Sequence, residues 1–86
     1  MIDLKIITIE GVFYSGQVSE IILPTETGQI AVLPHHIPLI SALKEGVVTL
    51  KINNQKNISE KKIHISSGVL EVREGSVVYI LVDHAV

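Results

Sequence analysis

Cysteine is absent from this sequence of 86 residues, and so is tryptophan. Without cysteine the chain can form neither a disulfide framework nor a thiolate metal site, which suits a reducing compartment and leaves burial to stabilise the fold. Only Phe13, Tyr14 and Tyr79 are aromatic, although 47% of the residues are hydrophobic. The core must therefore consist of isoleucine, valine and leucine, and branched aliphatic side chains at this density favour β-strands.

Long apolar runs and clusters of basic residues are missing as well. No run of about 18 apolar residues occurs, and no basic N-terminal segment leads into an apolar one, so we expect neither a membrane span nor a signal peptide. The formal net charge is −2, and the seven basic residues are spread along the chain. This distribution argues against nucleic acid as a partner.

Apolar and polar residues alternate in short runs, whereas no segment has the period of about 3.6 residues that a helix requires. Ile2, Leu4 and Ile6 share one face of the first run, and Val48 and Leu50 repeat the pattern later. Such runs at intervals of about ten residues predict an all-β protein with an antiparallel sandwich or barrel. The length allows a single domain, residues 1–86.

Turn residues separate the runs at residues 44–46, 53–55 and 73–76, where glycine or asparagine tolerates a tight reversal. We therefore predict a meander of hairpins in the second half of the chain. Residues 12–23 are long for one strand, and Ser15 with Gly16 predicts a bend within it.

The prolines of the middle segment, residues 25–41, confine it to short edge strands and loops. Leu39, Ile40 and Leu43 have the spacing of one helical turn, but Pro38 and Gly46 leave no room for more.

Two segments, residues 6–9 and 77–82, are apolar on both faces, whereas a strand of a two-layer sandwich turns only one face inward. Either a loop of the same chain covers the second face or a partner protein does. Because no helix is available to cover it, we expect a partner. The residues of this predicted patch are Ile7, Ile9, Val77, Tyr79 and Leu81.

Residues for catalysis or for binding cofactors are scarce. His35 and His36 are adjacent, so on extended chain they point in opposite directions and do not readily share a metal, although a metal-dependent hydrolase using this pair stays open as an alternative. Residues 25–29 contain one glycine and no following lysine, which predicts a turn and not a phosphate-binding loop. We expect this turn to require a positive φ at Gly28. We expect no catalytic residue, no cofactor and no metal.

Residues 21–46, IILPTETGQIAVLPHHIPLISALKEG, resemble the most distinctive segment of the ε subunit of bacterial F-type ATP synthases, and the likeness extends over residues 3–85. The family pattern combines a turn glycine, an Ile-Leu-Pro segment, a His-x-Pro-Leu segment and an Asp-x-Ala ending. The residues that keep their places include Gly28, Ile30, Leu33, Pro34, His36, Pro38, Leu39, Gly46, Gly68, Glu71, Val72, Gly75, Asp83 and Ala85.

The chain departs from the family pattern at four positions. Gln29 replaces an acid, Ala31 and His35 each replace a glycine, and Ser67 replaces the first residue of a Gly-Gly pair. Without the acid, no ion pair with a basic loop of the membrane ring can form at Gln29.

The resemblance implies an N-terminal domain that is an antiparallel β-sandwich of about ten short strands. It further implies a non-catalytic rotor subunit that links the γ subunit to the polar loops of the membrane c-ring, supports the coupling of ion flow to ATP synthesis, and does not insert into the membrane itself. The implied location is the cytoplasmic face of the bacterial inner membrane. The implied contacts are Thr8, His36 and Ser41 toward γ, and Glu26, Gly28 and Gln29 toward the ring.

We add Tyr79 to the expected γ contacts, because it is the largest side chain of the predicted apolar patch. Family members commonly continue into a helical hairpin to which inhibition of ATP hydrolysis and ATP binding belong. This sequence ends at Val86, so we expect the hairpin to be naturally absent or removed and assign neither property here. The alternative is a carbohydrate- or peptide-binding sandwich, which would need an aromatic platform or a concave polar site.

Overall fold

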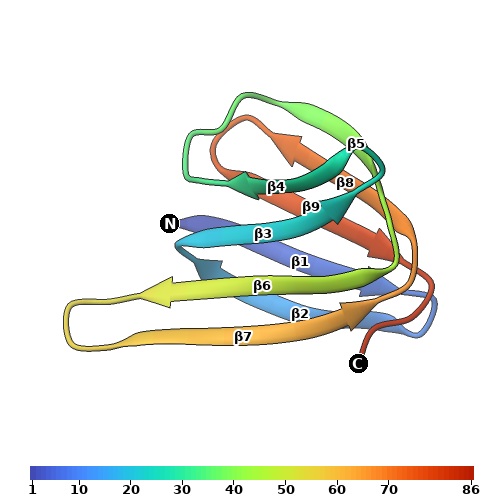
Figure 1. The fold of residues 1–86 in the computed structure, drawn as a ribbon. Coiled ribbons are helices and arrows are strands. Elements are labelled where there is room, and N and C mark those ends of the chain that lie inside the picture. Colours follow the sequence, from blue (N-terminus) through green and yellow to red (C-terminus); the bar gives the residue numbers. More distant parts are fainter.

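Strands form every regular element of the computed structural model, which describes residues 1–86 (Figure 1). None of its elements is a helix long and apolar enough to cross a membrane. The nine strands are β1 (Ile2–Thr8), β2 (Gly11–Val18), β3 (Glu20–Thr25), β4 (Gly28–Val32), β5 (Leu39–Leu43), β6 (Gly46–Asn53), β7 (Ile58–Ile65), β8 (Gly68–Arg73) and β9 (Val77–Val82).

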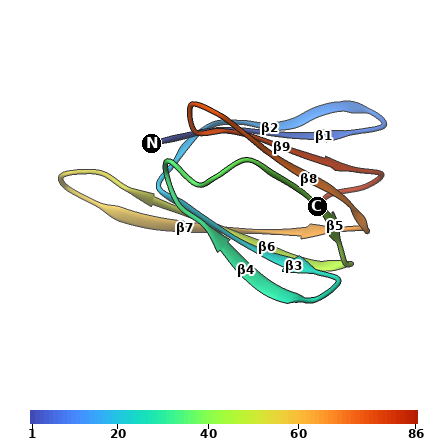
Figure 2. The same ribbon diagram turned by 90° about the horizontal axis from the view of Figure 1, so that it is seen from above.

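The strands form one curled sheet that folds over into two layers (Figure 2). The first layer runs β2-β1-β9-β8-β5, and the second contains β4, β3, β6 and β7. The layers join through one pair, Thr25 with Leu43, and again where residues 84–86 lie antiparallel to β7 through an Ile65–Ala85 bridge. The predicted all-β sandwich is confirmed.

One detail differs from the expectation. β1 and β9 pair in parallel, because the two ends of the chain meet in the middle of the first layer without a hairpin to join them. The nine strands agree with the expected number of about ten, and residues 84–86 add one isolated bridge to β7.

The core is aliphatic, as the shortage of aromatic residues predicted. Alternation along each strand sends every second side chain into the space between the layers, where seventeen buried residues form one cluster. Tyr14, at the rim of the cluster, is the one aromatic residue that packs against it. The fully buried members with the largest side chains are Ile2, Leu4, Ile6, Ile21, Leu23, Leu43, Leu50, Ile63, Leu70 and Ile80.

Two of the predicted hairpins are present. Residues 54–57 join β6 to β7, and residues 74–76 join β8 to β9, where Gly75 and Ser76 have φ of 81° and 59°. The hairpin predicted at residues 44–46 is wrong. The chain there crosses between layers, because β5 pairs with β8 while β6 pairs with β3 and β7.

The segment predicted as one strand bent at Gly16 is two strands that separate at Ser19. Ser19 N–H donates to Lys51 O at 2.7 Å and Ser19 Oγ accepts from Asn53 N–H at 2.8 Å, so this residue ties the crossing chain to β6. The irregularity within β2 lies at Phe13, the extra residue between the pairs Ile6–Tyr14 and Ile7–Val12.

The helical turn considered for residues 39–43 is also wrong. This segment is β5, which pairs residue by residue with β8 from Leu39–Val72 to Leu43–Gly68. Hydrogen bonds to a neighbouring strand outweigh a local spacing that fits one helical turn.

Candidate interaction surface

The outer face of the first layer carries apolar side chains that no other part of the chain covers. The strand register places Ile7 beside Leu81 and Leu81 beside Val69 in one row across β1, β9 and β8. Leu81 is 42% exposed and Val69 is 40% exposed, whereas Ile7 is half-buried. We call Ile7, Val69, Val77, Tyr79 and Leu81 the outer face.

Four of these residues belong to the patch predicted from the sequence, and no loop of the chain covers them. Ile9, the fifth predicted member, lies beyond the end of β1 and is 71% exposed. Val69 was missed, because the other outward residues of β8, Glu71 and Arg73, are charged and the strand follows an ordinary alternation.

Tyr79 lies beside two charged side chains, Arg73 and Glu71, on the same face. The Arg73 guanidinium stacks on the Tyr79 ring, with Cζ 4.5 Å from the ring centre, and Arg73 Nη2 donates to Glu71 Oε1 at 3.1 Å. The hydrogen bond and the negative charge of Glu71 raise the pKa of Arg73 above its usual value, so the guanidinium stays charged. An aromatic ring beside a fixed arginine is the type of group that dominates binding energy in protein interfaces.

A shallow cavity of about 260 Å³ adjoins Tyr79 between β2, β1 and β9. Gln17 Nε2 donates to Asp3 Oδ1 at 2.9 Å across it, and Lys5 pairs with Tyr79 in the strand register. Polar side chains therefore border the apolar row on one side, as in the rim of a protein interface.

The β3–β4 turn is a second protruding element. Glu26 and Thr27 form its tip, and Thr25 Oγ1 closes it by accepting from Thr27 N–H and donating to Gly28 O. Gly28 has φ of 125°, which confirms the positive φ expected there. The turn is thus shaped by its backbone, with Glu26 and Gln29 exposed around it.

The histidines do not form a site. His35 N–H donates to Ser76 Oγ at 2.9 Å, and His36 Nδ1 lies 2.7 Å from Ile37 O. No group of three histidine, aspartate or glutamate side chains in the chain could hold a metal ion.

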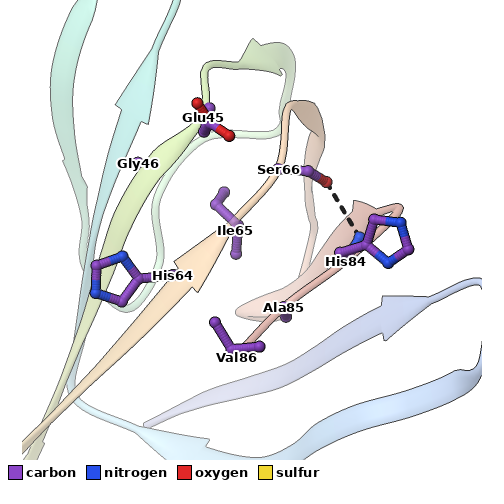
Figure 3. A pocket seen from close by; sticks show the side chains of 8 residues that line it. All are labelled: Glu45, Gly46, His64, Ile65, Ser66, His84, Ala85 and Val86. Atoms are coloured by element: carbon purple, nitrogen blue, oxygen red, sulfur yellow. Dashed lines mark hydrogen bonds between the residues drawn. The ribbon is translucent and has the colours of Figure 1, made fainter.

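A cavity of about 320 Å³ lies where residues 84–86 meet β7 (Figure 3). His64 and His84 lie on opposite sides of it and Glu45 lies at its rim, so the three side chains do not converge on a common point (Figure 3). Ser66 Oγ accepts from His84 N–H at 3.1 Å, which holds the end of the chain in place. The cavity therefore lies where the last residues of the chain pack against β7, and it has no cluster of side chains that could bind a metal.

Residues 1–86 match the model of one protein family, described as ATP synthase, Delta/Epsilon chain, beta-sandwich domain. The chain belongs to this family. It is 35% identical over 83 residues to ATP synthase epsilon chain 2 of Burkholderia orbicola and 39% identical over 85 residues to the ATP synthase epsilon chain of Campylobacter curvus. These matches cover 95% and 99% of this chain but 52% and 63% of the relatives, so the chain spans about half to two thirds of their length.

Solved structures agree with this delta/epsilon sandwich in fold. A chain in the cryo-EM structure of the Euglena gracilis mitochondrial ATP synthase, OSCP/F1/c-ring in rotational state 1, has a TM-score of 0.89 at 23% identity, covering 99% of this chain and 52% of that one. A chain of the Tetrahymena thermophila mitochondrial ATP synthase central stalk and c-ring has a TM-score of 0.82 at 15% identity, covering 99% and 65%.

The residues that the family resemblance assigns to γ lie on separate elements. Thr8 ends β1, where its Oγ1 accepts from Glu10 N–H at 3.1 Å, and His36 lies in the β4–β5 loop. Ser41 on β5 pairs with buried Leu70 and so belongs to the core-facing row, whereas Tyr79 lies on the opposite side of the layer. The structure therefore does not gather these four residues into one patch, and their role stays a prediction.

The residues assigned to the ring, Glu26, Gly28 and Gln29, do lie together in the β3–β4 turn. Replacing Gly28 by valine is expected to destabilise the chain by about 1–3 kcal/mol, because a β-branched residue does not tolerate φ of 125°. Gln29→Glu changes an exposed side chain and is expected to leave stability within about 0.5 kcal/mol. Urea unfolding of the two variants measures this difference, and equal midpoints would contradict the strained turn.

Proposed function

We propose that this chain is a non-catalytic subunit of the central stalk of an F-type ATP synthase, where it links the γ subunit to the c-ring. The observation that carries the proposal is the family match over residues 1–86, together with the similarity to proteins named as ATP synthase epsilon chains. Since the chain spans only part of those relatives, the proposal concerns what a β-sandwich of this family can do with its own surfaces.

The outer face of the first layer suits the γ subunit. Val69 and Leu81 supply exposed apolar area, and Tyr79 with Arg73 supplies an aromatic and guanidinium pair beside it. A partner that covers this face removes apolar surface from water and leaves the charged group at the rim, which is the usual arrangement of a stable protein interface. The interface is expected to be of standard size, on the order of 1,600 Å² in total.

The β3–β4 turn suits a polar loop of the c-ring. Its tip is exposed and carries Glu26, and its shape depends on the backbone at Gly28. With Gln29 in place of the usual acid, contact there depends on shape and hydrogen bonding, because an exposed ion pair contributes only about 0–1 kcal/mol and is screened by salt. The subunit would then lie at the cytoplasmic face of a bacterial inner membrane and transmit torque without entering the bilayer.

Reconstitution from purified components tests this function. We expect the chain and γ to elute together from a size-exclusion column as an equimolar complex, and a tagged chain to capture the c-ring only when γ is present. The tag alone controls for non-specific capture. Failure of the chain to bind γ would contradict the proposal, and capture of the ring without γ would contradict γ as the main attachment.

A further inference from the structure

Four strands of the sheet, β2, β4, β5 and β7, have one side without a neighbouring strand along most of their length. Natural proteins protect such edges with charged residues, bulges or covering segments, because unpaired backbone groups accept strands from other molecules. β7 carries Glu60, Lys61 and Lys62, and residues 84–86 cover its end. β2 is interrupted by the bulge at Phe13. β5 is joined to the second layer at its end, where Leu43 pairs with Thr25 and Ala42 O accepts from Glu26 N–H at 3.3 Å.

β4 has none of these protections. Residues 28–32 contain no charge, no proline and no bulge, and β4 pairs only with β3, along the outside of the second layer (Figures 1 and 2). Ala31 and Gln29 are exposed, and Ile30 is half-buried against the core.

The register with β3 decides which backbone groups are free. Pro24 pairs with Gln29, yet Pro24 has no N–H, and its carbonyl accepts from Lys44 N–H at 2.9 Å on the side away from β4. The pair Pro24–Gln29 is therefore a non-hydrogen-bonded pair. Because the two kinds of pair alternate along an antiparallel ladder, Ile22–Ala31 is the next non-hydrogen-bonded pair. The N–H and C=O groups of Gln29 and Ala31 consequently point out of the free edge.

We propose that β4 pairs with β4 of a second copy of this chain, antiparallel and centred on Ile30. In that register Gln29 of each copy faces Ala31 of the other, so the outward N–H and C=O groups satisfy one another across both pairs. Ile30 meets the partner's Ile30 on the core side, and apolar cross-strand pairs of this kind stabilise sheets. The absence of charge on the strand means that two copies do not repel at the contact.

Self-pairing through β4 would occupy the strand that carries Gly28 and Gln29, which begin at the β3–β4 turn. The free chain would then hide the residues assigned to the ring, and the self-paired form and the form bound to the ring would exclude one another. This inference does not depend on the proposed function, because self-association is measured on the chain alone.

Sedimentation equilibrium of the 86-residue chain tests the pairing. We expect reversible dimers at concentrations below about 1 mM. Ala31→Lys places each lysine opposite Gln29 of the other copy, with the two lysines diagonal to one another at about 7–8 Å, and their repulsion is expected to raise the dimer dissociation constant roughly threefold to fivefold. Ala42→Lys is the matched control, because Ala42 is also an exposed strand residue but belongs to β5 on the outer side of the first layer. It should leave the dissociation constant unchanged.

The double variant Gln29→Glu with Ala31→Lys tests the register, since each introduced carboxylate faces an introduced ammonium of the other copy. It is expected to restore most of the affinity lost in Ala31→Lys. Hydrogen exchange of the unmodified chain gives a second measurement. The amides of Gln29 and Ala31 should gain protection as concentration rises, whereas the Ile30 amide, which faces Leu23 in β3, should be protected throughout.

A chain that stays monomeric at about 1 mM would overturn the proposal. A dimer that responds to Ala42→Lys as strongly as to Ala31→Lys would move the contact to the first layer and overturn it equally. A dimer weakened by Ala31→Lys but not restored by the double variant would refute the antiparallel register.

Discussion

Replacing Gly68 with alanine is expected to lower the free energy of unfolding by about 3 kcal/mol or more, with a corresponding fall in the urea midpoint. A Cβ at this position would lie 2.1 Å from Leu81 O and 2.6 Å from Val82 Cγ1. The carbonyl cannot rotate away, because Gly68 pairs with Val82 in the β8–β9 ladder, so the strands themselves must separate.

Gly46→Ala is the matched control. The added Cβ there would lie 3.1 Å from Pro24 Cγ, a side-chain atom that can shift by a few tenths of an ångström. We expect a loss of less than about 1 kcal/mol. If the two variants unfold at the same urea concentration, the claim that the close approach of β8 and β9 requires glycine at position 68 is wrong.

Replacing Tyr79 with aspartate is expected to weaken binding to the γ subunit by about 2–4 kcal/mol, because it removes the largest apolar contact area of the outer face and the ring on which Arg73 stacks, and puts a charged carboxylate in their place. The chain itself should stay folded, since Tyr79 lies on the side of β9 away from the core. Titration calorimetry with γ measures the affinity, and urea unfolding checks the fold.

Two control variants make the result specific. Tyr79→Phe keeps the ring and is expected to lose less than about 1 kcal/mol of binding energy. Val47→Asp introduces the same charge at a residue of the second layer, on β6, which is 37% exposed, and should leave γ binding unchanged. Equal losses for Val47→Asp and Tyr79→Asp would contradict the outer face as the docking site, and unfolding of Tyr79→Asp would make Tyr79 a core residue.

Local patterns in the sequence were sufficient for several features of this fold. Alternation of apolar residues predicted the strands and the aliphatic core, since side chains on a strand have a period of two whatever the strand pairs with. The reversal at residues 74–76 and the positive φ of Gly28 followed from residue type, because only a few residues tolerate such backbone. The apolar excess on residues 77–82 likewise predicted the exposed row that includes Leu81.

Other features depended on which strands pair, and a periodic pattern carries no information about that choice. The sequence alone determined that this chain is built of strands around an aliphatic core, and that it resembles the family to which it belongs. Only the tertiary structure decided that residues 39–43 form a strand beside β8, that β1 and β9 pair in parallel, and that β4 is the edge left without protection. The physical reason is that hydrogen bonds between segments distant in sequence select among local conformations of similar energy.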